Sequence, residues 1–496
     1  MPIRIPHRSL VLPLTLVACM NTTRDEGSPF DGAGTDSHGP AAPTTASGSP
    51  SAGDDGVDDG SDGGGPPSLD VGSPESGDGA GEGGECPPLP GGNAELHGIV
   101  TAPNGELPIS GALVWVQDEP PDGVPDEVYC LECIEVPCDT PHAITGADGS
   151  FSLSAVAGSQ WLVVSKGQFM RATPIELAAG GQAAASESTR LPNRRAPDEG
   201  QWMPNIALAW GDYDALQDAL AKLGLGELDG SGQHLAPGTE AFDVWDNHAD
   251  NFGSTPQNPI TTMSMGTLEA LVSDADALSK YHIVFVPCAS GNAAFTPAQL
   301  DNIRAWVAAG GKWYVADWSL AWLDEPFGQY QTFWQDGWSG GPYLDAFDTN
   351  GTVLDDALLA WLDALPPSLA DINPLNPGGG HPTLGQLPHV PLEDLWSTIE
   401  STPPVLVDDG QGNMIDVGHK VWIEGPGGGE DGAPADQAWP LTVTGEYGCG
   451  KILFTSYHTT EWETYVGLSP QELVLMYLIL EIGTCQVPLP PPTPAG

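Results

Sequence analysis

The stretch YHIVFVPCASGNAAFTPAQLDNIRAWVAAGGKWYVAD, from Tyr281 to Asp317, decides the fold of the larger part of this chain. Its first run, 282–288, is apolar and rich in β-branched residues, which predicts a buried strand. Thr296 and Gln299 form a capping box that begins a helix, and a Gly-Gly pair ends it. The run 312–317 predicts a second buried strand. Strands that alternate with helices in this way are typical of an α/β sheet.

Similar apolar runs elsewhere extend the predicted sheet. Further buried strands are expected at 206–210, 242–245 and 451–457. Together these elements predict a three-layer α/β domain of the flavodoxin type over residues 200–487, with a loop-rich insertion at about 340–440. The apolar helix expected at 470–482 is too short to cross a bilayer and is placed in the core. Residues 488–496 form a Pro-rich tail.

A second pattern precedes this domain. Residues 91–190 show short alternating strands separated by turn signals, which predicts a small β-sandwich. The motifs at 98–101 (GIVT), 108–116 (PISGALVWV) and 145–151 (TGADGSF) resemble the carboxypeptidase regulatory-like, or transthyretin-like, module. The resemblance implies a fold and little about activity, because these motifs are turns and core positions. An insertion at about 117–141 interrupts the strand spacing and carries three cysteines.

The charge of the chain excludes some partners. There are 67 acidic residues against 14 basic ones, which gives a formal net charge of -53. Such a field repels nucleic acid and anionic membrane surfaces, so nucleic acid is not expected as a partner. The composition favours solubility outside the cell. No cofactor is predicted, and the acidic composition leaves the binding of divalent cations, calcium among them, open.

The N-terminus predicts lipid anchoring. Residues 1–18 have a basic start and a short apolar run, as secretory signals do, and end in Leu-Val-Ala before Cys19. This pattern resembles a bacterial lipobox, which implies acylation of Cys19 and anchoring to the lipid bilayer at the outer membrane or cell surface. The alternative is an ordinary signal with a chance cysteine. Residues 19–90, rich in Gly, Ser, Pro and Asp, are expected to form a disordered acidic tether.

The larger domain is similar to the class I glutamine-amidotransferase-like superfamily. The similarity rests on the strand, the helix with its Gly-Gly end and the next strand, followed much later by a strand that ends in His-Thr-Thr-Glu, 458–461. The family places a nucleophilic cysteine on a sharp turn that falls here at 316–319, which has no cysteine and no flanking glycine. His458 matches the family histidine, and the acid is displaced to Glu461. Cys288 lies where the family has its oxyanion loop, so we expect it to be a buried structural thiol.

Polar side chains follow the expected strands. Because ligands bind beyond the carboxyl ends of strands in open α/β sheets, we predict a cleft that holds a cation or a polar ligand. The predicted lining residues are Asp317, Trp318, His458 and Glu461. Two other acids at strand ends, Asp212 and Asp246, are explained equally well as caps of a helix and a turn.

The eight cysteines allow several pairings. Lipidation of Cys19 leaves seven, and the lengths of the last strand and helix predict a Cys449–Cys485 disulfide. Two further bridges are expected among Cys86, Cys130, Cys133 and Cys138, which leaves Cys288 free. The alternative is a zinc site made of Cys130, Cys133, Cys138 and His142.

These features predict a membrane-anchored extracytoplasmic lipoprotein that binds or adheres without catalysis. A glycan, a peptide or a surface protein is the expected ligand, and the 16 Trp residues suit the first two. The alternative function is hydrolysis at a degenerate amidotransferase-like site formed by Asp317, His458 and Glu461, with a metal ion as an aid.

Overall fold

The computed structural model describes residues 92–131, 136, 139–247, 260, 262–289, 294–334, 346–378, 380–429, 433–459, 465–482 and 489–492. All of them belong to one compact unit, Gly64–Gly496. The expected signal peptide, Cys19 and the acidic tether lie outside the described residues. So do Cys86, Cys133, Cys138, Glu461 and Cys485. The chain is a multidomain, mixed α/β protein.

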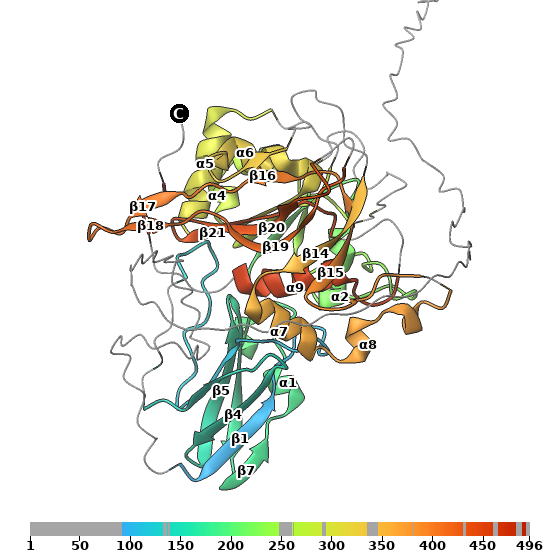
Figure 1. Cartoon of the computed structure of the whole chain (residues 1–496). Helices are drawn as coiled ribbons and strands as arrows, with labels where there is room; N and C mark the ends of the chain where they lie inside the picture. Colours follow the sequence, from blue (N-terminus) through green and yellow to red (C-terminus); the bar gives the residue numbers. More distant parts are fainter. Residues whose placement is uncertain are drawn as a thin grey trace, which may run out of the picture. The chain divides into compact units, whose positions relative to one another are not determined.

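Two sheets occupy the first part of the described chain (Figure 1). One has the order β4-β1-β7, with β1 at Ala94–Ile99, β4 at Ser150–Ala155 and β7 at Gly180–Ala183. The other has the order β3-β2-β5-β6-β8, with β2 at Leu113–Gln117, β3 at His142–Ile144, β5 at Gly158–Lys166, β6 at Phe169–Leu177 and β8 at Gln201–Trp202. Every other residue of β4 is buried, as expected for a strand with one face on a core.

The two sheets share a core and are joined by a tight turn. Leu96 and Leu153 of one sheet lie in the same apolar cluster as Val114 and Val164 of the other. Gly149 in the turn before β4 has a φ of 74°, and a Cβ there would lie 2.7 Å from the Val100 carbonyl oxygen. The turn therefore requires glycine.

The main sheet has nine strands in the order β10-β9-β11-β12-β21-β20-β19-β14-β15. The first five are parallel, and the rest pair antiparallel. The parallel strands are β9 at Ile206–Trp210, β10 at Asp243–Asp246, β11 at Ile283–Val286, β12 at Lys312–Ala316 and β21 at Gly450–Thr455. The others are β14 at Phe347–Val353, β15 at His389–Leu395, β19 at Lys420–Pro426 and β20 at Ala438–Tyr447. All five strands that the sequence predicts in this part of the chain are confirmed within a few residues.

Helices cover both faces of this sheet. They are α2 at Leu216–Leu223, α3 at Leu268–Ser273, α4 at Ala275–Leu278, α5 at Pro297–Ala308, α6 at Ala321–Phe327, α7 at Asp356–Ala364 and α9 at Pro470–Ile482. Figure 1 shows α5 and α6 on one side of the strands and α7 and α9 on the other. Successive side chains of a strand point to opposite faces: Phe285 of β11 packs in the cluster that contains α9, and Val284 packs in the cluster that contains α5. The predicted capping box of α5 is confirmed.

Short elements complete the described chain. They are α1 at Ser186–Thr189, α8 at Pro367–Ala370, the 3-10 helices η1 at Pro197–Glu199, η2 at Asp317–Leu320 and η3 at Asn373–Leu375, and the strand pairs β13 (Thr332–Phe333) with β16 (Ile399–Ser401) and β17 (Leu406–Asp408) with β18 (Met414–Asp416). Among the described residues, no helix has both the length and the apolar character that a membrane span requires.

The sequence predicts a loop-rich insertion at about 340–440, and the structure corrects this prediction. Strands β14, β15 and β19 come from this region and extend the main sheet. Its proline and glycine content suggested loops. However, Pro391 lies in β15, the last strand of the sheet, and edge strands tolerate proline because one side of the backbone needs no ladder partner.

The disulfide prediction is also corrected. Cys449 pairs with Cys130, not with Cys485, across a sequence separation of 319 residues. The insertion of the sandwich lies against the main sheet and its helices: the Val128 amide donates to the Ser279 carbonyl at 2.8 Å. Element lengths place Cys449 and Cys485 at one end of the sheet, but they say nothing of the path of this insertion. Because Cys130 is bonded to Cys449, neither the zinc set nor the two extra bridges can include it.

Candidate functional site

The candidate site lies beyond the carboxyl ends of three parallel strands. Cys288 follows β11, Asp317 directly follows β12, and His458 follows β21. Counted along the chain, the parallel strands have the order 2-1-3-4-5, so the connections reverse direction between β9 and β11. Ligands of doubly wound sheets bind at this edge, close to the point of reversal.

Asp317 is held in an unusual backbone conformation. Its φ is 48°, and it is one of two described non-glycine residues with a positive φ. Asp317 is the first residue of η2, and its side chain is fully buried. The Oδ1 atom accepts a hydrogen bond from the Trp396 amide at 3.2 Å. Sparsely populated backbone conformations of this kind cost about 1–3 kcal/mol and cluster at functional sites.

His458 is buried and fixed by its neighbours. Its carbonyl oxygen accepts a hydrogen bond from Nε2 of Gln471 on α9 at 2.6 Å. The next residue, Thr459, donates its amide to Asp214 at 3.0 Å, and its hydroxyl lies 2.8 Å from the hydroxyl of Tyr314. The imidazole Nε2 lies 3.2 Å from Oδ2 of Asp317. The backbone of His458 and the next residue are therefore held by α9, by β12 and by the segment after β9.

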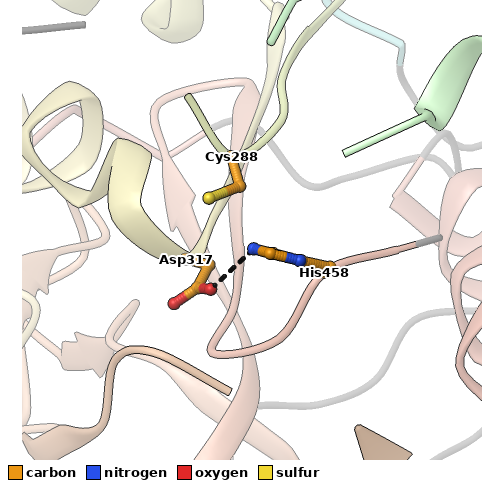
Figure 2. A group of neighbouring side chains, drawn as sticks. All are labelled: Cys288, Asp317 and His458. Carbon is orange, nitrogen blue, oxygen red and sulfur yellow. Dashed lines mark ion pairs between the residues drawn. The ribbon is translucent and has the colours of Figure 1, made fainter. Parts of the chain in front are cut away.

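Cys288 completes the cluster. It is free and buried, as the sequence predicts. Its sulfur, one Asp317 oxygen and one His458 nitrogen all lie within 4.8 Å of one another. Figure 2 shows that the thiol and the carboxylate both approach the same side of the His458 ring, towards the nitrogen that pairs with Asp317. The carbonyl of Cys288 is so close to Gly211 that a Cβ on Gly211 would lie 2.2 Å from it.

The three side chains perturb one another. Burial raises the pKa of the Cys288 thiol to about 12, so the thiol is protonated at neutral pH. Burial also raises the pKa of Asp317, and His458 opposes that effect. For His458 burial alone lowers the pKa, but Cys288 and Asp317 outweigh it and hold the pKa well above its usual value.

The structure brings together two of the four predicted lining residues, Asp317 and His458. The ring of Trp318 is half-buried and contacts Tyr213 and Trp396, with centroids 6.0 and 5.1 Å away. Glu461 lies outside the described residues. The expected cap by Asp212 is wrong, since the N-cap of α2 is Ala215 and has no side-chain cap.

Sequence reasoning missed Cys288 as a member of the site. The sequence indicates a structural thiol, because Cys288 lies where the amidotransferase-like family has its oxyanion loop. The signal that could have found it is the end of β11, which lies at the same sheet edge as Asp317 and His458. Its neighbour in the cluster, His458, is remote in sequence and close in space.

Comparisons with known proteins give similarities to solved structures, two of which are as follows. No protein-family model matches the chain, and no curated protein matches it. A crystal structure of a ThuA-like protein from Bacteroides uniformis is similar to 56% of this chain and 90% of its own, at 11% identity and a TM-score of 0.30. A cytoplasmic protein from Salmonella typhimurium is similar to 56% of this chain and 99% of its own, at 12% identity and a TM-score of 0.27.

Proposed function

We propose that this chain is a lipid-anchored, extracytoplasmic binding protein that holds a cation or a small polar ligand at the carboxyl edge of its parallel strands. The observation that carries the proposal is the buried pair of Asp317 and His458, whose Oδ2 and Nε2 atoms are 3.2 Å apart. Burying two ionisable groups is costly, and such pairs with shifted pKa values at a sheet edge are typical of functional sites.

Several features favour binding over the chemistry of class I amidotransferases, whose architecture we propose for the α/β domain. The turn after β12 presents Asp317 where those enzymes present a cysteine. The Cys288 thiol, with a pKa of about 12, is a poor source of thiolate. In a nucleophile–His–acid triad the acid and the nucleophile engage opposite nitrogens of the imidazole. Here Cys288 and Asp317 face the same one (Figure 2).

The extracytoplasmic location rests on two observations. The lipobox that ends at Cys19 supports anchoring, and the Cys130–Cys449 disulfide supports an oxidising compartment. We propose the outer membrane or cell surface as the location. The sandwich, with its carboxypeptidase regulatory-like motifs, would present the site or bind a glycan, a peptide or a surface protein of its own.

A ligand screen on the full-length chain tests the binding function. Cations and small polar compounds are screened by thermal shift, and hits are confirmed by calorimetry on the wild type, Asp317→Asn and Asp394→Asn. Asp394 is the matched control, because it is also an aspartate with a positive φ, at 54°, but lies outside the cluster. We expect binding that Asp317→Asn abolishes and Asp394→Asn retains. A screen without hits, or hits that Asp317→Asn leaves unchanged, would contradict the proposal.

A second candidate function is hydrolysis, with His458 as the general base and Asp317 as its partner. The strained backbone of Asp317 at the end of β12 favours it, because such strain is common at active sites. Turnover of model esters or amides that is lost in His458→Gln and retained in Asp394→Asn would support it. Absence of turnover with bound ligand would leave the binding function alone.

A further inference from the structure

The cluster contains a third side chain beside Asp317 and His458, and its geometry points to one kind of ligand. We infer that Cys288, Asp317 and His458 bind a single zinc-type divalent metal ion through the thiolate, a carboxylate oxygen and Nε2. This inference rests on the proposed binding function and names the cation. It also gives a role to Cys288, which neither the fold nor a catalytic triad explains.

The first support is convergence. Three donor atoms from three different strand ends lie within 4.8 Å of one another, and two of them face one imidazole nitrogen (Figure 2). A tetrahedral zinc ion with bonds of about 2.0–2.1 Å to nitrogen and oxygen separates those two ligand atoms by about 3.4 Å. The observed separation of Oδ2 and Nε2 is 3.2 Å. The carboxylate and the imidazole therefore already have nearly the spacing that a shared ion requires.

The second support is the lack of hydrogen bonds at this point. Within the described part of the chain, Asp317 Oδ2 and both ring nitrogens of His458 are buried without a partner at hydrogen-bonding geometry. Oδ2 and Nε2, 3.2 Å apart, are thus close enough for an ion pair but are not aligned for a hydrogen bond. A buried polar atom without a partner costs about 1–3 kcal/mol. A metal ion between the two atoms would satisfy both.

The donor types select the metal. Calcium and magnesium take oxygen ligands almost alone, whereas a thiolate beside an imidazole suits zinc and its neighbours in the transition series. Calcium, which the acidic composition left open, therefore does not fit this cluster.

The number of donors has a further consequence. Zinc sites with three protein ligands keep a fourth position for water or a bound molecule, whereas structural zinc sites use four protein ligands. Among the described residues, the cluster offers three donors. The fourth position is where a polar ligand of the proposed binding function would attach.

Cobalt substitution tests the inference. Full-length protein is stripped with a chelator and titrated with Co²⁺ and then Zn²⁺, while metal content and the near-ultraviolet thiolate-to-cobalt band are recorded. We expect one ion per chain and a thiolate band in the wild type. Cys288→Ser and Cys288→Ala should lose the band. Asp317→Asn should weaken affinity at least about 100-fold, because even outer-shell changes typically cost about 10–100-fold.

His142→Ala is the matched control, because His142 belongs to the alternative zinc set near Cys130. Its Nδ1 contacts the Thr140 carbonyl at 2.9 Å, outside the cluster. This variant should keep both the band and the affinity. Circular dichroism establishes that each variant is folded. The cobalt spectrum of the wild type tests for a thiolate ligand even without the variants.

The possible failures are distinguishable. The inference is wrong if metal binds without a thiolate band, or with a band that Cys288→Ser retains. In that case the binding function still stands if Asp317→Asn abolishes binding. The same holds if no metal binds but the ligand screen finds a polar compound that depends on Asp317. If neither a metal nor any other ligand binds, both the inference and the proposed function are wrong.

Discussion

The carboxylate of Asp317 lies 3.2 Å from the imidazole of His458, with both side chains buried. The pairing of two parallel strands produces this contact: Ala316 at the end of β12 is in register with Thr455 at the end of β21. Asp317 comes one residue after this pair and His458 three residues after it. The Cys288 thiol reaches the same point from the adjacent strand, β11.

Asp317→Gly should separate function from stability. Glycine adopts a φ of 48° without the steric cost of about 1 kcal/mol that a side chain brings in the left-handed region. The variant also removes a buried carboxylate with a raised pKa. We expect the metal-free variant to unfold at equal or higher urea concentration than the wild type, with metal binding abolished. A loss of more than about 2 kcal/mol would indicate that Asp317 is structural.

Cys19→Ser should release the protein from membranes. In the lipoprotein that we propose, acyl chains on Cys19 provide the anchoring. The measurement is the distribution of protein between membrane and soluble fractions after a salt wash. Retention of the variant on membranes would refute the lipoprotein prediction.

The Cys130–Cys449 bridge should be detectable and should stabilise the fold. Non-reduced peptide mapping should recover the two cysteines in one linked peptide pair. Cys130→Ala with Cys449→Ala should lower the free energy of unfolding by about 2–5 kcal/mol, because the bridge closes a long loop. Cys485→Ser, the control, should leave stability unchanged. A Cys449–Cys485 peptide pair would contradict the structure.

Lys312 should make stability depend on pH. Burial, together with the smaller effect of the Lys451 charge, lowers the pKa of its amine to about 7; His282 is another titratable group close to it. Its Nζ donates to the Gly310 carbonyl at 2.6 Å. Above about pH 7 the folded amine loses its proton while the unfolded one keeps it, so the unfolded state binds more protons. The free energy of unfolding should therefore rise with pH from about 7 towards about 10.

Urea denaturation at several pH values measures this slope. Lys312→Met should flatten it, because the buried amine is gone. Lys280→Met, which changes an exposed lysine, is the matched control and should keep the wild-type slope. An unchanged slope in Lys312→Met would show that other groups dominate the pH dependence.

The sequence was sufficient for the strands and helices that carry strong local signals. The apolar strand at β12 and the capping box of α5 appear where the pattern predicts them, because an apolar run and a capping box are signals within a few neighbouring residues. The strands β14, β15 and β19 were missed because each contains a glycine or a proline, which are loop signals in a sequence. Of the three, only β15 lies at the edge of the sheet, where proline is tolerated.

Part of the candidate site was also predictable from the sequence. The rule that ligands bind at strand ends placed Asp317 and His458 together. Three-dimensional contacts decided the rest. The choice of Cys130 as the partner of Cys449 depends on the path of a long insertion, and the proximity of Cys288 to His458 depends on the register of three strands.

The most direct test of the metal site is an anomalous difference map at the zinc edge, from crystals of the full-length chain grown with zinc. We predict one strong peak within about 2.0–2.4 Å of the Cys288 sulfur, an Asp317 carboxylate oxygen and Nε2 of His458. A map in which these three side chains are ordered, zinc is present in the crystal and no peak lies between them would contradict the account.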